Sequence, residues 1–138
     1  MNWYLKVIKD NYANFNGRAR RQEYWMFTLF HVIIVFVLAF LSGALAESAD
    51  SPVALIVLLI YVLATFLPAL AVTVRRLHDT GKSGWYYLLT LIPYIGGIIL
   101  LVFTVQNGDV GPNQYGPDPK HPDANNEIDD IGKPLIED

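Results

Sequence analysis

The sequence has no cysteine and little charge, and both absences narrow the classes of protein that it can encode. Without cysteine, disulfide bonds, thiolate metal sites and cysteine nucleophiles are excluded. Charged residues make up 17% of the chain, against about 25% in an average soluble protein. Hydrophobic residues make up 53% of its 138 residues. This composition indicates a chain that lies in lipid rather than in water.

Three long segments lack Asp, Glu, Lys and Arg altogether, and we expect each to be a transmembrane helix. They are residues 24–45, 52–74 and 85–105. Each is close to the roughly 20 residues that a helix needs to cross about 30 Å of hydrocarbon. None shows the polar face at helical spacing that a helix on the surface of a soluble protein has. We therefore predict an all-α integral membrane protein with three transmembrane helices.

The third segment contains Pro93, Gly96 and Gly97 near its middle, which predict a kink or a break. A kinked continuous helix would place residues 111–119 on the opposite side of the membrane from residues 75–82. Two half-helices that re-enter would return them to the same side. Each half would have only about ten residues, too few to span, so the continuous helix is favoured.

The two ends of the chain differ in character. Residues 1–15 carry aromatic and aliphatic side chains at i, i+3, i+4 spacing, with Lys6, Lys9 and Asp10 on the other side. This pattern predicts an amphipathic helix in the membrane interface, which starts a membrane domain over residues 1–119. Residues 120–138 are acidic, contain Pro and Asn and are almost free of aromatic residues, so we predict a disordered tail.

The positive charges are unevenly distributed and predict the orientation. All Lys and Arg residues except Lys120 and Lys133 lie at or before Lys82. The connection between the first two spans carries Glu47 and Asp50 and no basic residue. Because basic connections stay in the cytoplasm, we expect a multi-pass protein of the plasma membrane. Its N-terminus would be cytoplasmic, and three spans would place the C-terminus outside.

The densest cluster of ionisable residues is RRLHDTGKSGW, residues 75–85. Its GKS resembles the end of a P-loop, but that motif requires a glycine where this chain has Arg76. His78 and Asp79 are adjacent, and neighbours on a helix point about 100° apart, so the pair alone is not a catalytic arrangement. One histidine with one or two carboxylates is also too few ligands for a transition metal. We therefore predict no enzymatic activity, no catalytic residue, no cofactor and no metal. A lipid-modifying activity, which would rest on His78 and Asp79 alone, stays open as a third alternative.

The basic residues at the cytoplasmic ends of the spans are candidates for contact with phosphate groups. Arginine forks match phosphate oxygens, and each basic group near an anionic leaflet contributes about 1 kcal/mol. Orientation alone also explains the charge, so a generic rim and a shaped phosphate pocket both stay open. The candidate residues for lipid, phosphate or partner binding are Arg18, Arg20, Arg21, Arg75, Arg76, His78, Asp79, Lys82 and Trp85.

Secondary candidates lie in the first span and after the third. His31 falls within the first span, where an ionisable group is a functional candidate, although it could simply hydrogen-bond Tyr61, Thr65 or a carbonyl. Asn113, Tyr115 and Asp118 lie in GPNQYGPDP, residues 111–119, where they could support consecutive turns or contact a ligand.

Three stretches together resemble one family. FNGRARRQEYW (residues 15–25), RRLHDTGKSGWYYLL (residues 75–89) and GPNQYGPDP are similar to the signatures of the DUF805 family of bacterial inner-membrane proteins. The resemblance covers residues 1–119 and implies a small polytopic protein of the inner membrane. It implies no reaction.

These observations predict a non-enzymatic scaffold, regulator or envelope-associated protein. Its basic rim would contact anionic lipid or a membrane-protein partner, and not nucleic acid. The alternative is an oligomeric transporter or binder of a small anionic solute or lipid. In that case Arg75, Arg76, His78 and Asp79 would form the gate and His31 would line the path. Ala39 and Gly43 permit the close helix approach that a homo-oligomer needs.

Overall fold

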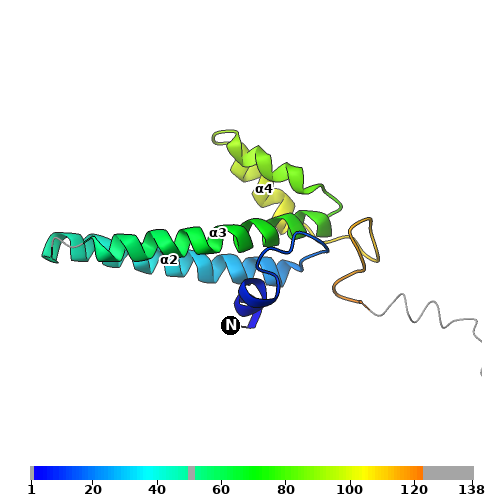
Figure 1. Cartoon of the computed structure of the whole chain (residues 1–138). Coiled ribbons are helices and arrows are strands. Elements are labelled where there is room, and N and C mark those ends of the chain that lie inside the picture. Colours follow the sequence, from blue (N-terminus) through cyan, green and yellow to red (C-terminus); the bar gives the residue numbers. More distant parts are fainter. Residues whose placement is uncertain (1, 50–51, 123–138) are drawn as a thin grey trace, which may run out of the picture.

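The computed structural model describes residues 2–49 and 52–122, and every regular element in this part of the chain is a helix. A long antiparallel pair is formed by α2 (Arg21–Ala49) and α3 (Val53–Asp79), as Figure 1 shows. Both helices are long and apolar enough to cross a membrane. The first two predicted spans are therefore confirmed as helices. The first runs beyond its predicted range at both ends, and the second only at its C-terminal end.

The extension of α3 to Asp79 changes the setting of the ionisable cluster. The last turn carries Arg76 and His78, and positive charge at a helix C-terminus is favourable. The helix ends because Gly81 takes the left-handed conformation, with φ 69°, while the Lys82 N–H donates to the Leu77 carbonyl. Residues 75–79 thus lie on a helix with fixed directions, and not in a loose connection.

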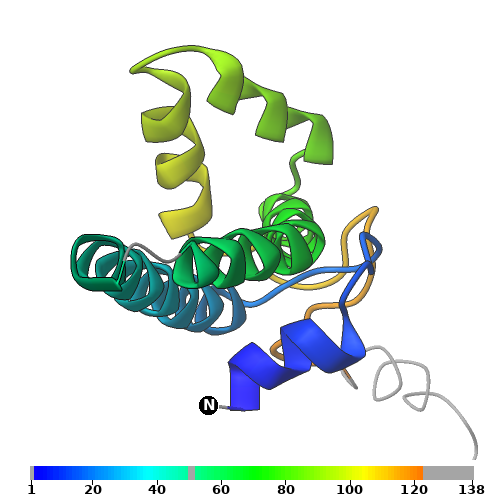
Figure 2. The ribbon, with the colours of Figure 1, turned by 60° about the vertical axis from the view of Figure 1, so that its left-hand side comes forward.

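The predicted third transmembrane helix is wrong, because residues 85–105 form two short helices that fold back on each other. The first is the 3₁₀-helix η2 (Gly84–Leu91) and the second is α4 (Gly96–Val105). At rises of 2.0 and 1.5 Å per residue, each is about 15 Å long, half the thickness of the hydrocarbon. Figure 2 shows this hairpin projecting from the α2–α3 pair. The re-entrant alternative describes the structure.

The turn of this hairpin has a clear physical cause. Pro93 cannot continue a helix, and Tyr94 then takes a positive φ of 65°. Gly96 allows the two halves to meet closely, since a Cβ there would lie 1.7 Å from the Leu89 carbonyl oxygen. Farther along, the rings of Tyr86 and Phe103 pack edge to face with centroids 5.7 Å apart.

The N-terminal helix is shorter than predicted. It comprises α1 (Asn2–Leu5) and one π-helical turn, η1 (Lys6–Asp10), so it ends at Asp10 and not at residue 15. The Asn14 side chain donates to Asn11 Oδ1 and accepts from the Asn16 N–H, and such local bonds compete with helical backbone bonds. The helix is amphipathic as expected, and its apolar side packs on α2 and α3.

The buried core lies at the end of the α2–α3 pair that carries the N-terminal helix. It contains Val7, Ala19, Phe27 and Val72. Farther along the pair, large apolar side chains are exposed, with Phe36 71% and Phe40 69% accessible. A surface of this kind suits lipid and not water. Of the predicted acidic tail over residues 120–138, residues 123–138 lie outside the described part.

Candidate functional site

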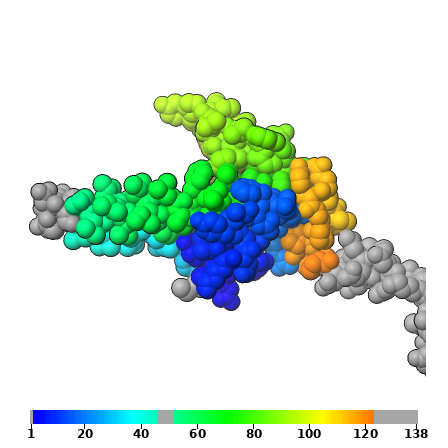
Figure 3. All heavy atoms as spheres, in the orientation of Figure 1, coloured from blue at the N-terminus to red at the C-terminus, as the bar shows by residue number. Residues whose placement is uncertain are grey.

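Three segments that are far apart in the sequence meet at one end of the α2–α3 pair. They are the residues that lead into α2, the last turn of α3, and residues 107–119 after α4. Figure 3 shows the N-terminal segment and residues 107–122 side by side at this end. Because the η2–α4 hairpin turns back, residues 111–119 lie on the same side as residues 75–82. The expectation that these two segments lie on opposite sides is therefore wrong.

Asp79 is the centre of the contacts between these segments. Its Oδ1 atom accepts a hydrogen bond of 3.0 Å from Arg18 Nε, and its Oδ2 atom accepts one from Arg76 Nη1. All three side chains are buried, and Arg76 is 0% exposed. A buried carboxylate between two guanidinium groups is charge-compensated, which a buried ion requires.

The remaining donors of the two arginines are used by backbone carbonyls. Arg18 donates to the Asp109 and Gly111 carbonyls, at 2.5 and 2.6 Å. Arg76 donates to three carbonyls, those of Ala19, Thr104 and Gln106. We call Arg18, Arg76, Asp79 and these carbonyls the buried arginine network. The network links the three segments. The guanidinium donors of its two arginines therefore already have partners within the protein.

One glycine, Gly108, makes room for the Asp79 carboxylate at the centre of the network. A Cβ at Gly108 would lie 2.1 Å from Asp79 Oδ2. Any other residue there would push the loop after α4 away from the carboxylate. Nothing in the sequence near Gly108 distinguishes it from an ordinary loop glycine.

His78 joins the same region through different partners from those of Asp79. Its ring stacks on Tyr115 with centroids 3.8 Å apart, and its Nδ1 lies 3.2 Å from the Gly17 carbonyl oxygen. Asn113 Nδ2 donates to the His78 carbonyl at 2.9 Å. Asn113 and Tyr115 therefore fasten the loop after α4 to the end of α3.

Asp118 supports the turns of this loop. Its carboxylate accepts the Lys120 N–H at 2.9 Å and the Gly111 N–H at 3.2 Å. The hydrogen bond from Lys120 lowers the pKa of Asp118 below its usual range, and the Gly111 N–H and the Arg18 charge act in the same direction. Of the two roles left open for Asp118, the structure shows turn support.

The other candidates lie around the rim of this end. Arg20 donates to the Pro119 carbonyl, and Arg21 donates to Asn107 Oδ1 at 2.8 Å. The Lys82 ammonium donates to Gln106 and sits over the Phe103 ring. Trp85 is 79% exposed and stands apart from the network.

His31 is engaged inside the helix pair. Its Nδ1 lies 3.1 Å from the Tyr61 hydroxyl, one of the partners expected for it, and its ring stacks between those of Phe27 and Tyr61. The Tyr61 hydroxyl also lies 3.0 Å from that of Tyr4, so this contact helps to hold the N-terminal helix against the pair.

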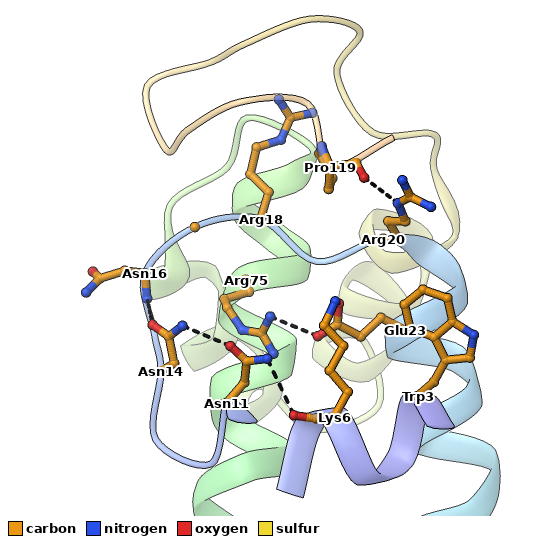
Figure 4. A pocket seen from close by; sticks show the side chains of 11 residues that line it. Trp3, Lys6, Asn11, Asn14, Asn16, Arg18, Arg20, Glu23, Arg75 and Pro119 are labelled. Carbon is orange, nitrogen blue, oxygen red and sulfur yellow. Dashed lines mark hydrogen bonds and ion pairs between the residues drawn. The ribbon is translucent and has the colours of Figure 1, made fainter. Parts of the chain in front are cut away.

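Arg75 differs from its neighbour Arg76, because its contacts leave two nitrogens free. It is 4% exposed, and its Nη1 forms an ion pair of 2.8 Å with Glu23 Oε1. Among the described residues, Arg75 Nε, Arg75 Nη2 and Glu23 Oε1 have no hydrogen-bond partner, so Arg75 and Glu23 are joined by charge alone. Arg75 lines a pocket of about 450 Å³ between the N-terminal helix and the start of α2 (Figure 4).

Glu23 is a site residue that the sequence reasoning missed. It is 3% exposed, lines the Arg75 pocket, and also lies 3.8 Å from Lys6 Nζ. A signal was present, since Glu23 is the one acidic residue beside three arginines at the start of the first span.

A second, apolar hollow of about 580 Å³ lies between α3 and η2. Leu70, Val74 and Leu88 line it, and His78 and Ser83 supply polar groups. Among the described residues, no three His, Asp or Glu side chains lie close enough together to hold a metal ion.

Comparison with known proteins places these features in a family. Residues 12–117 match DUF805, described as a protein of unknown function. The chain is 51% identical over 120 residues to inner membrane protein YhaH of Escherichia coli (strain K12), covering 87% of this chain and 98% of the relative. It is 48% identical to inner membrane protein YhaI of the same organism, covering 87% and 97%. No solved structure matches. The chain belongs to the DUF805 family of inner-membrane proteins.

Proposed function

We propose that this chain is a non-enzymatic membrane protein whose basic end associates with anionic phospholipid. One observation carries the proposal: the hairpin gathers the basic segments at one end of a body whose remaining surface is largely apolar. By the positive-inside rule this end faces the cytoplasm. There it lies at the depth of the lipid head groups.

The exposed cations at this end supply the attraction. Lys9 and Arg21 are exposed and are not part of the buried arginine network. Each contributes about 1 kcal/mol near an anionic leaflet, and this attraction needs no shaped site. The apolar hollow between α3 and η2 offers a place for hydrocarbon beside the same end. Both features suit an amphiphile with a negative head group.

The non-enzymatic part of the proposal is supported by how the reactive groups are used. Asp79 is neutralised by Arg18 and Arg76, while His78 is stacked on Tyr115 and faces a backbone carbonyl. The same contacts count against the transport alternative, because three of its four gate residues, Arg76, His78 and Asp79, hold the fold together. His31, which would line the path, is packed between aromatic rings.

The test is lipid selectivity in the full-length protein. We would reconstitute the chain in nanodiscs of phosphatidylcholine with a fraction of phosphatidylglycerol and count the lipids that it retains by native mass spectrometry. The variant Lys9→Gln with Arg21→Gln should lose about 1 kcal/mol of preference for phosphatidylglycerol per charge. The charge-preserving control, Lys9→Arg with Arg21→Lys, should behave as the parent.

Two outcomes contradict the proposal. An unchanged preference in the neutralised variant would show that these charges do not attract lipid. Turnover of a phospholipid by the purified protein, lost in His78→Ala, would show that the protein is an enzyme.

A further inference from the structure

We infer that the Arg75 pocket is a specific binding site for one phosphate-class oxyanion. The inference rests on the proposed function and deepens it, because it gives a phosphate group one defined place at the basic end. Lys9 and Arg21 attract anionic lipid without a defined binding position, whereas this site would bind one oxyanion per chain.

The unused edge of Arg75 carries the argument. Nε and Nη2 of a guanidinium point in parallel and match two oxygens of a phosphate group. In Arg75 these are the two nitrogens without a partner among the described residues, while Nη1 is held by Glu23. Burying guanidinium donors without an acceptor is costly, and an oxyanion that enters from the pocket and binds against this edge of Arg75 would satisfy both.

The charge of the pocket favours an anion. Lys6 and Arg20 line it together with Arg75, and Glu23 is the one carboxylate among the described lining residues. Figure 4 shows the Arg75, Glu23 and Lys6 side chains directed toward one another, with three asparagines along one side. The volume of about 450 Å³ falls within the range of roughly 300–1,000 Å³ that small-molecule sites occupy.

Arg75 differs from the two arginines of the buried arginine network, and the difference distinguishes a binding role from a structural one. The guanidinium groups of Arg18 and Arg76 donate to backbone carbonyls and to Asp79, so both arginines stabilise the fold. Arg75 uses one nitrogen for Glu23, while its Nε and Nη2 are buried without a partner among the described residues, in a side chain that lines the pocket. A purely structural role would need only the ion pair with Glu23.

The same chemistry serves a phospholipid head group or free phosphate, and two probes distinguish them. The full chain in dodecyl maltoside, which has no phosphate, is titrated with inorganic phosphate by calorimetry. A second titration uses phosphatidylglycerol in mixed micelles. Binding of both probes indicates an open oxyanion site, and binding of phosphatidylglycerol alone indicates a head-group site; either result supports the inference.

The variants test the assignment to Arg75. Arg75→Lys keeps the charge and removes the fork, and it should weaken binding about tenfold or more. Lys6→Gln should also weaken binding, whereas Lys120→Gln, an exposed control outside the pocket, should not. Glu23→Gln removes the competing carboxylate and should tighten binding. It should also increase the rise in unfolding temperature that the probe causes.

Glu23→Gln keeps the inference falsifiable if Arg75→Lys fails to fold. Absence of saturable binding of both probes to the parent protein would overturn the inference. Unchanged affinity in Arg75→Lys, or in Glu23→Gln where Arg75→Lys does not fold, would also overturn it. In either case the effect of Lys9→Gln with Arg21→Gln on lipid selectivity would still decide the proposed function separately.

Discussion

At the scale of single residues, the consecutive arginines Arg75 and Arg76 have different surroundings and different numbers of hydrogen-bond partners. Neighbours on a helix point about 100° apart, so Arg76 faces the loop after α4 while Arg75 faces α2 and the N-terminal helix. Arg76 finds three carbonyls and a carboxylate, and Arg75 finds only Glu23. The number of acceptors within reach decides which arginine is structural.

We predict that Arg76→Gln destabilises the protein by about 3 kcal/mol, because it breaks a buried ion pair and leaves several carbonyls without a donor. Arg21→Gln makes the same chemical change at an exposed position and should have little effect. Chemical unfolding of both variants in dodecyl maltoside measures the difference. Equal stabilities would show that the buried arginine network does not hold the three segments together.

The Asp118 carboxylate makes the loop over residues 111–120 sensitive to acid. Since the pKa of Asp118 is lowered in the folded protein, its contribution is complete at neutral pH and is lost as the pH falls below about 4. Hydrogen exchange of the Gly111 and Lys120 amides, corrected for the intrinsic effect of pH, should rise over that range. Asp118→Asn should show the rise already at pH 7. Protection that is unchanged in Asp118→Asn would contradict this account of the loop.

At the scale of elements, the η2–α4 hairpin is the feature on which the site depends. It returns the chain to the end where η2 begins, and the loop that follows α4 then reaches Arg18 and Arg76. Two neighbouring glycines at its turn have different surroundings. A Cβ at Gly96 would collide with the Leu89 carbonyl, whereas a Cβ at Gly97 would meet nothing within 4 Å.

We predict that Gly96→Ala opens the hairpin, at a cost of about 3 kcal/mol, while Gly97→Ala leaves it closed. The measurement is cross-linking of Tyr86→Cys with Phe103→Cys by a short bifunctional maleimide. Their parent rings are 5.7 Å apart, whereas a continuous helix would hold the two positions about 25 Å apart. Equal cross-linking in both alanine variants would show that Gly96 is not needed for closure.

The sequence predicted α2 and α3 because a long uncharged run has only one good solution in lipid, which is a helix. It predicted the third span wrongly because a half-helix was rejected for being too short to cross. A hairpin of two halves need not cross, and Pro93 with Gly96 provides its turn. The N-terminal helix ends early because of contacts among Asn11, Asn14 and Asn16. The spacing of apolar residues, on which the prediction was based, contains no information about such contacts.

At the scale of the whole molecule, the sequence named several residues that the structure brings together, but it predicted neither their meeting nor their roles. Arg18, Arg76, His78, Asp79, Asn113 and Tyr115 do come together. Which of them serve the fold depends on carbonyls that only the hairpin brings near. Glu23 and Gly108 were missed, because their importance lies in contacts across distant segments and not in any local pattern.

The central claim is that residues 107–119 lie on the same side of the membrane as the N-terminal segment. The absence of native cysteine makes a direct measurement simple. Ala13→Cys, Gln114→Cys and Pro52→Cys each place one thiol at an exposed position. Labelling by a membrane-impermeant maleimide is then compared in intact and opened cells.

The structure predicts that Cys substitutions at Ala13 and Gln114 behave alike. With the orientation expected from the positive-inside rule, both are labelled only after the cells are opened. The substitution at Pro52, between the two spans, should be labelled in intact cells. Labelling at Gln114 in intact cells, with Ala13 protected, would mean that residues 85–105 cross the membrane. The shared basic end would then not exist.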